Sequence, residues 1–168
     1  SKCLREKESR IYDIKIYPIN KTTVKITWKT DKETFGSVWI EEQDKVDEIL
    51  KKAFHCNFTG NLVIEKEKVR ETLQKCNCSF VVKNNETFLV HNGNLYGFCL
   101  TSSLTSTKEL VGCIFKEDKL SKNHSVVLDI LQPDTEYSLK IRSHFYCEDP
   151  VVGFTGIESE RIVKFKMS

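Results

Sequence analysis

The chain has 168 residues, enough for one domain with a substantial core but too few for two full domains. Its 26 basic and 24 acidic residues are spread along the whole length and give a formal net charge of +2, so no basic stripe indicates nucleic acid as a partner. No window is apolar enough for a bilayer span or for the core of a signal peptide, and the chain begins at Ser1. We therefore expect a processed secreted protein or an ectodomain segment, held at a membrane only through an anchor outside these residues.

Three segments near the start alternate between apolar and polar residues, the period expected of half-buried strands. The first runs over residues 11–17 and meets Pro18, which a sheet tolerates at an edge or at the end of a strand. The second has apolar residues at every other position: Val24, Ile26 and Trp28. A turn is predicted at 31–34, and a third strand over 35–42 follows it.

The pattern then changes to a helical one. Asp44 is a helix-capping residue type, and the apolar residues after it share one face of a 3.6-residue repeat: Val46, Ile49, Leu50, Ala53 and Phe54. A second helix is predicted over 65–75. We expect the apolar faces of both helices to pack against a sheet.

Short strands are predicted after the helices. Asn92-Gly93 favours a tight hairpin turn, because both residues accept positive φ angles, and it predicts a three-stranded meander over 78–99. A Ser/Thr-rich loop is predicted over 101–108. Another strand is predicted over 110–115, and the pattern leaves open which sheet it joins.

Two alternating strands in the last third meet at a proline corner. The first covers 125–131, Pro133 marks the turn, and the second places three apolar residues on one face: Tyr137, Leu139 and Ile141. A tyrosine just past such a corner can turn its hydroxyl back onto the preceding main chain, an arrangement known from two-sheet sandwiches. A loop is predicted over 144–156 and a last strand over 161–166.

Two of these motifs together resemble the fibronectin type III pattern: Val24-x-Ile26-x-Trp28, and Leu131-x-Pro133-x-Thr135-x-Tyr137-x-Leu139-x-Ile141. The resemblance covers residues 10–45 and 120–168, about half of the chain. It implies a mainly β fold, one fibronectin type III-like antiparallel β-sandwich domain over 1–168. Residues 46–119 depart from the family, and we expect them to form an insertion of two short helices and a β-meander within that domain.

Glycosylation triplets and cysteines indicate an oxidising, extracellular compartment. Five of the nine asparagines stand in Asn-x-Ser/Thr triplets: Asn20, Asn57, Asn77, Asn85 and Asn123. The seven cysteines are candidates for disulfides: Cys3, Cys56, Cys76, Cys78, Cys99, Cys113 and Cys147. We expect the chain to be secreted or to lie on the extracellular side of the plasma membrane. Because seven is odd, one thiol is left free, or it pairs with a second chain or with another part of the protein.

The resemblance also implies one disulfide. In the fibronectin type III family the start of the first strand and the loop after the sixth lie at the same pole, which implies a bond between Cys3 and Cys147. Two further pairings are expected inside the insertion: Cys56 with Cys76 or Cys78, and Cys99 with Cys113.

Catalytic and metal sites are not predicted. Four residues carry ligand atoms suited to tetrahedral zinc, but Cys-x-Cys is tighter than the usual zinc knuckle: His55, Cys56, Cys76 and Cys78. The chain has no G-x-S-x-G elbow, no catalytic-cysteine signature and no phosphate-binding glycine loop. We therefore expect no enzyme activity, no metal and no cofactor.

Two aromatic regions are candidates for binding a protein. The predicted loop 144–156 carries apolar residues of the kind that anchor interfaces: Phe145, Tyr146, Val151, Val152 and Phe154. The alternative is that this loop folds back on the core, held by Cys147. Trp39 faces away from the side of Val38 and Ile40, and it is either exposed or covered by the insertion.

These observations favour an extracellular protein-binding module, a receptor ectodomain segment that recognises a protein ligand. Neither Trp-Ser-x-Trp-Ser nor Arg-Gly-Asp occurs, which disfavours haematopoietic cytokine receptors and integrin ligands. One alternative is a free secreted antagonist or decoy that binds a host or partner protein. A secreted enzyme is the disfavoured third hypothesis.

Overall fold

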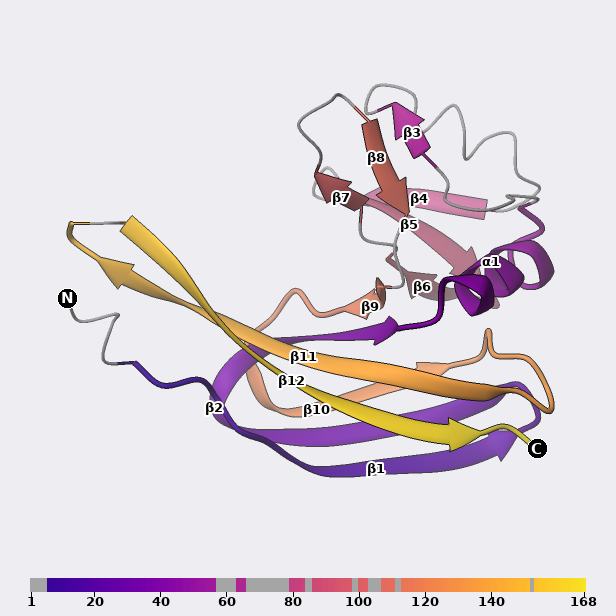
Figure 1. The fold of residues 1–168 in the computed structure, drawn as a ribbon, viewed down its shortest axis with the longest axis horizontal. Coiled ribbons are helices and arrows are strands. Elements are labelled where there is room, and N and C mark those ends of the chain that lie inside the picture. Colours follow the sequence, from indigo (N-terminus) through magenta and orange to yellow (C-terminus); the bar gives the residue numbers. More distant parts are fainter. Residues whose placement is uncertain are drawn as a thin grey trace.

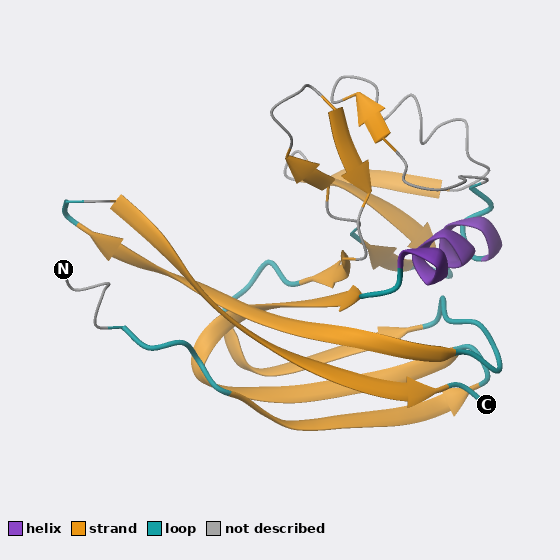
Figure 2. Cartoon of the chain, viewed as in Figure 1, coloured by secondary structure: helices purple, strands orange, loops and turns teal. Residues whose placement is uncertain are grey.

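The computed structural model describes residues 6–56, 63–65, 79–83, 86–97, 100–102, 107–110, 113–151 and 153–168. Within these ranges the chain is mainly β, with antiparallel sheets and one short helix (Figure 2). Six strands build the main body: β1 (Ile11–Asn20), β2 (Thr23–Ile40), β9 (Cys113–Lys116), β10 (Ser121–Leu128), β11 (Glu136–Asp149) and β12 (Gly153–Lys166).

Strand β2 belongs to both layers of this body (Figure 1). Its first part, residues 24–30, pairs with β1 on one side and β10 on the other. Its last part, residues 35–40, pairs with β9 and β11, and β12 pairs with the far side of β11. We call β1, the first part of β2 and β10 sheet A. We call β9, the last part of β2, β11 and β12 sheet B.

The core lies between the two sheets, where alternate side chains of each strand point inward. Sheet A contributes the predicted apolar face of β2 together with alternate residues of β10: Val24, Ile26, Trp28, Val126 and Leu128. Sheet B contributes residues from β2 and β11: Val38, Ile40, Tyr137, Leu139 and Ile141. The alternation predicted for these segments is therefore confirmed, and the architecture is that of the β-sandwich class.

The corner between β10 and β11 has the predicted tyrosine geometry. The main-chain N–H of Gln132 donates a hydrogen bond of 2.8 Å to the hydroxyl oxygen of Tyr137. The turn itself contains Asp134, whose φ of 58° lies in the left-handed region. The Tyr137 side chain thus fastens the start of β11 to the segment that leads out of sheet A.

In strand β1 a bulge at Asp13 changes which residues point inward, so buried and exposed positions do not alternate regularly along the whole strand. Asp13 has a φ of 53°, and the pairing with β2 is irregular between Tyr12 and Lys15. This bulge moves the inward positions from Ile11 to the partly buried Ile14 and Ile16. Pro18 lies within β1, an edge strand of sheet A, where its missing N–H is tolerated.

Two predicted connections are strands instead. Residues 31–34, predicted as a turn, form a bend inside the continuous strand β2. Residues 144–156, predicted as a loop, form most of the distal half of a long hairpin in which β11 and β12 pair from Glu136 and Lys166 to Asp149 and Gly153. Its exposed apolar residues interrupt the alternation of buried positions, so the sequence pattern resembled a loop.

Helix α1 (Gln43–Lys52) confirms the first predicted helix, with the expected apolar face buried. Its N-cap is Glu42 rather than Asp44, and no side chain caps the helix; Asp44 lies in the first turn, where a carboxylate interacts favourably with the helix dipole. No helix among the described residues is long and apolar enough to cross a membrane. Of the second predicted helix, Glu65 lies in a strand, and residues 66–75 lie outside the described residues.

Six short strands form two further antiparallel sheets beside α1 (Figure 1). The predicted meander is confirmed as β4 (Ser79–Lys83), β5 (Glu86–His91) and β6 (Asn94–Tyr96). The second sheet contains β3 (Val63–Glu65), β7 (Leu100–Ser102) and β8 (Thr107–Leu110). The loop predicted over 101–108 is therefore wrong at both ends, where pairing with neighbouring strands makes strands of polar residues. The strand predicted over 110–115 is β9, which begins at Cys113 and joins sheet B.

Candidate functional site

The outer face of sheet B gathers large side chains that the core does not use. Successive residues of a strand point to opposite faces, so the buried Ile141 and Ser143 of β11 alternate with residues that point outward. We define the outer face by the outward residues of β2 and β11 that contact one another: Phe35, Ser37, Trp39, Arg142, His144 and Tyr146.

Arg142 is held over the indole ring of Trp39. Its guanidinium carbon lies 5.2 Å from the ring centroid, within the range of a cation–π contact. Glu158 binds the same guanidinium at 2.5 Å and Glu160 lies 3.8 Å from its Nε atom. The indole N–H donates to the Ser37 hydroxyl at 2.8 Å. Both large side chains are therefore fixed in orientation before any ligand arrives.

Three rings form a second cluster on this face. The centroid of His144 lies 5.3 Å from that of Phe35 and 5.6 Å from that of Tyr146, the latter edge-to-face. Burial lowers the pKa of His144 and Arg142 lowers it further, while Glu158 raises it; the net effect is a lowered pKa. His144 is therefore neutral at pH 7, and the outer end of the cluster is Tyr146, which is 58% exposed.

A small notch lies between the Trp39–Arg142 pair and the ring cluster. It has a volume of about 160 Å³, and its walls include Ser37, Trp39, Lys116, Arg142 and Tyr146. Sites for drug-sized molecules usually span about 300 to 1,000 Å³. The notch therefore fits a single side chain of a partner better than a metabolite.

The structure brings together only some of the residues predicted to bind. Trp39 and Tyr146, far apart in the sequence, line the same notch. Phe145 points to the opposite face of β11, where the Lys32 ammonium lies 5.1 Å from its ring centroid. Val151 and Phe154, at the turn end of the β11–β12 hairpin, are 88% and 73% exposed, whereas Cys147 and Asp149 of the same segment are buried. Val152 lies outside the described residues.

Sequence reasoning missed Arg142 and His144 as members of this face. A usable signal existed, because the period of two that starts at Tyr137 continues through Ile141 and Ser143 and leaves Arg142, His144 and Tyr146 in phase with one another. The predicted loop boundary at 144 broke that phase. The partner residues on β2 could be found only from the pairing of β2 with β11.

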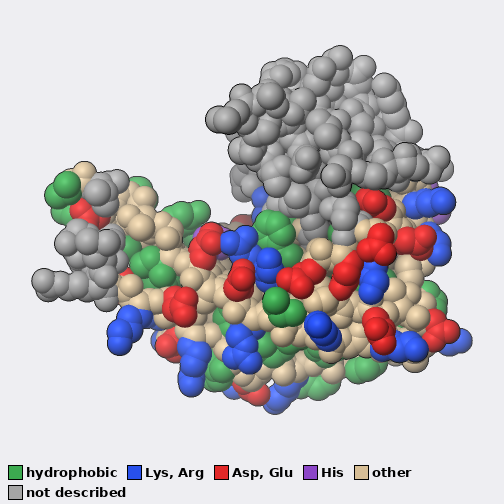
Figure 3. All heavy atoms as spheres, viewed as in Figure 1, with side chains coloured by type: hydrophobic (Ala, Val, Ile, Leu, Met, Phe, Trp, Pro, Cys, Tyr) green, Lys and Arg blue, Asp and Glu red, His purple; other side chains and the backbone are tan. Residues whose placement is uncertain are grey.

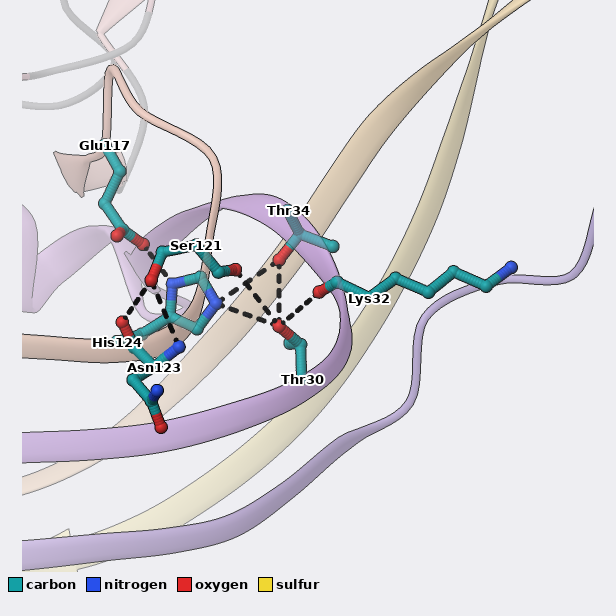
Figure 4. Close-up of polar contacts among 7 residues, drawn as sticks. All are labelled: Thr30, Lys32, Thr34, Glu117, Ser121, Asn123 and His124. Atoms are coloured by element: carbon teal, nitrogen blue, oxygen red, sulfur yellow. Dashed lines mark hydrogen bonds and ion pairs between the residues drawn. The ribbon is translucent and has the colours of Figure 1, made fainter.

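A buried polar cluster at the bend of β2 was also missed (Figure 4). His124 Nδ1 lies 2.6 Å from a carboxylate oxygen of Glu117, and Nε2 lies 3.0 Å from the Thr30 hydroxyl and 3.3 Å from that of Thr34. The imidazole ring also stacks on Trp28, with 5.2 Å between the ring centroids. The cluster joins the bend of β2 to the segment between β9 and β10.

This order of hydroxyl, imidazole and carboxylate is the one that activates a nucleophile in hydrolases. Here His124, Thr30 and Thr34 are all buried. The Thr30 hydroxyl donates to the main-chain carbonyl of Lys32 at 2.8 Å, so its proton is already used within the bend. Among the described residues these atoms are enclosed, and their contacts support the bend of β2.

A third polar cluster joins the β4–β5–β6 sheet to the sandwich around Asp129. The side chains of Asn92 and Asn94 donate to its carboxylate at 3.3 and 3.2 Å, and the Tyr96 hydroxyl donates to it as well. In return the main-chain N–H of Asp129 donates to the Tyr96 oxygen at 2.9 Å. Residues from the β5–β6 hairpin thus surround one carboxylate at the end of β10, which positions the meander against the sandwich.

Two of the five predicted glycosylation sites lie among the described residues. Asn20 ends β1 and Asn123 lies in β10, and both are exposed strand residues of sheet A. The other three lie outside the described residues: Asn57, Asn77 and Asn85.

Three of the seven cysteines are described. Cys113 and Cys147 are disulfide-bonded, and Cys56 is buried with its sulfur 3.6 Å from the carbonyl oxygen of Phe54. The remaining four lie outside the described residues: Cys3, Cys76, Cys78 and Cys99. The pairings Cys3–Cys147, Cys99–Cys113 and Cys56 with Cys76 or Cys78 therefore stay predictions.

Within the described ranges, no three side chains of His, Cys, Asp or Glu converge to hold a metal ion. Comparison of the chain with protein-family models, with curated proteins and with solved structures gave no match.

Proposed function

We propose that this chain is an extracellular protein-binding module of the fibronectin type III type, a segment of a receptor ectodomain. The strand order of sheets A and B, the buried Trp28 and the Tyr137 corner support the family proposal. On this proposal residues 1–168 are one domain, and residues 46–119 are an insertion that carries α1 and the two small sheets. The module has no enzymatic role.

The observation that carries the proposal is the pre-oriented outer face of sheet B. Trp, Tyr and Arg are the residue types that dominate the binding energy of protein interfaces. Here Trp39, Arg142 and Tyr146 are fixed by contacts within the chain, so little side-chain entropy would be lost on binding. A protein partner that inserts one side chain into the notch between them would contact all three.

The β11–β12 hairpin extends this face beyond the body of the sandwich (Figure 1). Phe154 and Val151 at its end are the most exposed large apolar side chains among the described residues. Exposed apolar groups next to an aromatic face are typical of interaction sites. We include this end of the hairpin in the proposed ligand surface, in place of the loop expected from the sequence.

Charge and glycan placement are compatible with a protein ligand. In the view of Figure 3, acidic and basic side chains are interspersed over the described surface of the main body, as on a general protein surface. Asn20 and Asn123 belong to strands of sheet A, so glycans there would leave the outer face of sheet B open. This arrangement supports a secreted or cell-surface location.

Capture of partners with matched variants tests the proposal. The glycosylated wild-type protein is used to enrich partners from extracellular fluid and from cell surfaces, beside a variant carrying Tyr146→Ala and Phe154→Ala. The control carries Ile19→Ala and Val127→Ala, two exposed apolar residues of sheet A. We expect one protein that the wild type and the control retain and the Tyr146/Phe154 variant loses at unchanged thermal stability.

Equal retention by all three proteins would contradict the proposed surface. The identity of the retained protein separates the two binding hypotheses. A soluble ligand supports a receptor segment, whereas a membrane receptor supports the secreted antagonist or decoy.

A further inference from the structure

Strand β12 is a long edge strand with one unpaired side. It runs for 14 residues along β11, and among the described residues no other main chain pairs with its opposite edge. In the described part of the N-terminal arm, residues 7–11 lie beside residues 158–161 and contact β12 through side-chain hydrogen bonds: the Ser159 hydroxyl donates to the carbonyl of Ser9 and Arg161 donates to that of Ile11. An edge of this length presents main-chain donors and acceptors that can pair with another strand.

The outward residues of β12 form a symmetric charge pattern. Since Ile162 faces Lys140 across the hairpin, the even-numbered residues of β12 lie on the outer side of sheet B. In order they are two acids, one apolar residue and two bases: Glu158, Glu160, Ile162, Lys164 and Lys166. All five are exposed, Ile162 by 50%.

This pattern is self-complementary in one antiparallel register. If two copies of β12 pair with Ile162 opposite Ile162, each Glu160 faces a Lys164 and each Glu158 faces a Lys166 of the other copy. Moving the centre by one residue to Arg161 places two arginines opposite each other. Moving it to Val163 keeps only the Glu160–Lys166 match and sets Lys164 against Ile162. Cross-strand pairs of opposite charge stabilise a sheet and like charges destabilise it, so the first register is favoured.

The charges within one copy leave room for such partners. Among the described residues, Glu158 and Glu160 form ion pairs with one cation, Arg142. Lys164 and Lys166 make no ion pair with any described residue. A second copy would bring one lysine to each of these acids and one acid to each of these lysines.

We propose that two copies of this chain associate through β12, antiparallel about a two-fold axis at Ile162. The contact is isologous, as in most homodimers, and it joins the two B sheets into one continuous sheet of eight strands. The glutamates and lysines of β12 disfavour pairing with most other strands at this edge. They favour pairing with an antiparallel second copy of β12. The dimer places two outer faces side by side, so a divalent or membrane-bound ligand would be held by both. It uses the edge of sheet B and does not depend on the proposed ligand surface.

A charge exchange tests the register. The Glu160→Lys variant would set its introduced lysine against Lys164 of the other copy, and Lys164→Glu would set two glutamates against each other. By symmetry each substitution changes two pairs, so we expect either variant alone to dimerise about tenfold more weakly than the wild type. An equimolar mixture restores both attractive pairs and is expected to recover the wild-type dissociation constant. Sedimentation equilibrium in low and high salt measures all four samples, and the wild-type dimer should weaken with salt.

The control is Lys25→Glu, an exposed charge reversal in the middle strand of sheet A, which should leave dimerisation unchanged. A second readout uses Ile162→Cys, which is expected to give a disulfide between the two introduced cysteines in peptide maps of the oxidised protein, whereas Lys164→Cys is not. A wild type that stays monomeric at high concentration would overturn the proposal. So would a dimer that neither single variant weakens, a mixture that fails to recover, or equal cross-linking at both positions.

Discussion

The hydroxyl oxygen of Tyr137 accepts a hydrogen bond from the main-chain N–H of Gln132, five residues earlier in the chain. The ring of Tyr137 is buried and packs against Phe165 of β12, with 6.0 Å between the ring centroids. One side chain therefore links the end of sheet A, the first residues of β11 and the last residues of β12. It fastens the connection by which the chain passes from β10 in sheet A to β11 in sheet B.

Replacing Tyr137 by Phe should destabilise the fold without changing its shape. The variant keeps the ring but leaves the Gln132 N–H without its acceptor, which costs about 1 to 3 kcal/mol for a buried donor. Tyr17→Phe, at an exposed position of β1, is the matched control and should change the free energy of unfolding little. Urea unfolding measures both, and equal midpoints for wild type and Tyr137→Phe would contradict the role of the hydroxyl.

The bend of β2 should tolerate no side chain at Gly36. A Cβ added there would lie 2.8 Å from the Trp28 ring and 3.2 Å from His124 Nδ1, and it would also collide with the Glu117 carboxylate. We expect Gly36→Ala to reduce the free energy of unfolding by about 1 to 3 kcal/mol, as overpacking does in other cores.

Gly156→Ala is the control for this substitution, because its Cβ would meet only the Tyr146 ring at 3.7 Å. Thermal unfolding of the two variants compares them directly. A Gly36→Ala protein as stable as the Gly156→Ala protein would show that the cluster around His124 does not constrain the bend.

Acid should loosen the β4–β5–β6 sheet from the sandwich through Asp129. Partial burial favours a higher pKa for this carboxyl, but hydrogen bonds from Tyr96, His91 and Asn94 outweigh it and hold the pKa below its ordinary value of about 4. As the pH falls, the unfolded chain takes up this proton first. The stabilisation is therefore complete above about pH 4 and is lost as the pH falls through the folded pKa.

The Asp129→Asn variant should be less stable at neutral pH and should lose part of this acid dependence. Unfolding free energies of both proteins, measured from neutral pH to about pH 2.5, test the prediction. Parallel pH profiles for wild type and variant would mean that Asp129 does not carry the effect.

His144 should add a second pH dependence at milder acidity. Burial is the largest cause of its lowered pKa, so the folded state binds this proton less readily than the unfolded chain. Stability from this group is complete above its ordinary pKa of about 6.5 and declines as the pH falls toward the folded pKa. We expect His144→Gln to flatten the slope of unfolding free energy between about pH 7.5 and 5.5. An unchanged slope would place the titrating group elsewhere.

Local sequence patterns predicted the strands and the helix that have one apolar, buried face and one polar, exposed face. The apolar side of β2 at Val24, Ile26 and Trp28, the buried face of α1 and the corner at Tyr137 all follow from residues close in sequence. The distal half of the β11–β12 hairpin was read as a loop because its buried residues include the polar Asp149 while large apolar residues such as Phe154 are exposed. This blurs the apolar–polar contrast that marks a strand. The bulge at Asp13 could not be predicted either, because it shifts the alternation of inward and outward residues within a single strand, β1.

Contacts between distant residues account for the rest. The bend at 31–34 looks like a turn, yet His124, about ninety residues later, holds it within a continuous strand through Thr30 and Thr34. The outer face likewise needs the pairing of β2 with β11 before Trp39 meets Arg142. Trp39 and Tyr146 were named from their residue types, but their common notch could not be inferred without that register.

We propose that a protein partner binds the outer face of sheet B around Trp39. The most direct measurement uses the partner that the wild-type protein captures. Its affinity is measured for Trp39→Ala and for the control Val127→Ala on sheet A. Both variants are first checked for unchanged unfolding midpoints. Loss of a central aromatic anchor typically costs at least about 2 kcal/mol, so we predict binding about thirtyfold weaker for Trp39→Ala and unchanged for Val127→Ala. Equal affinities for the wild type and a folded Trp39→Ala protein would contradict the account.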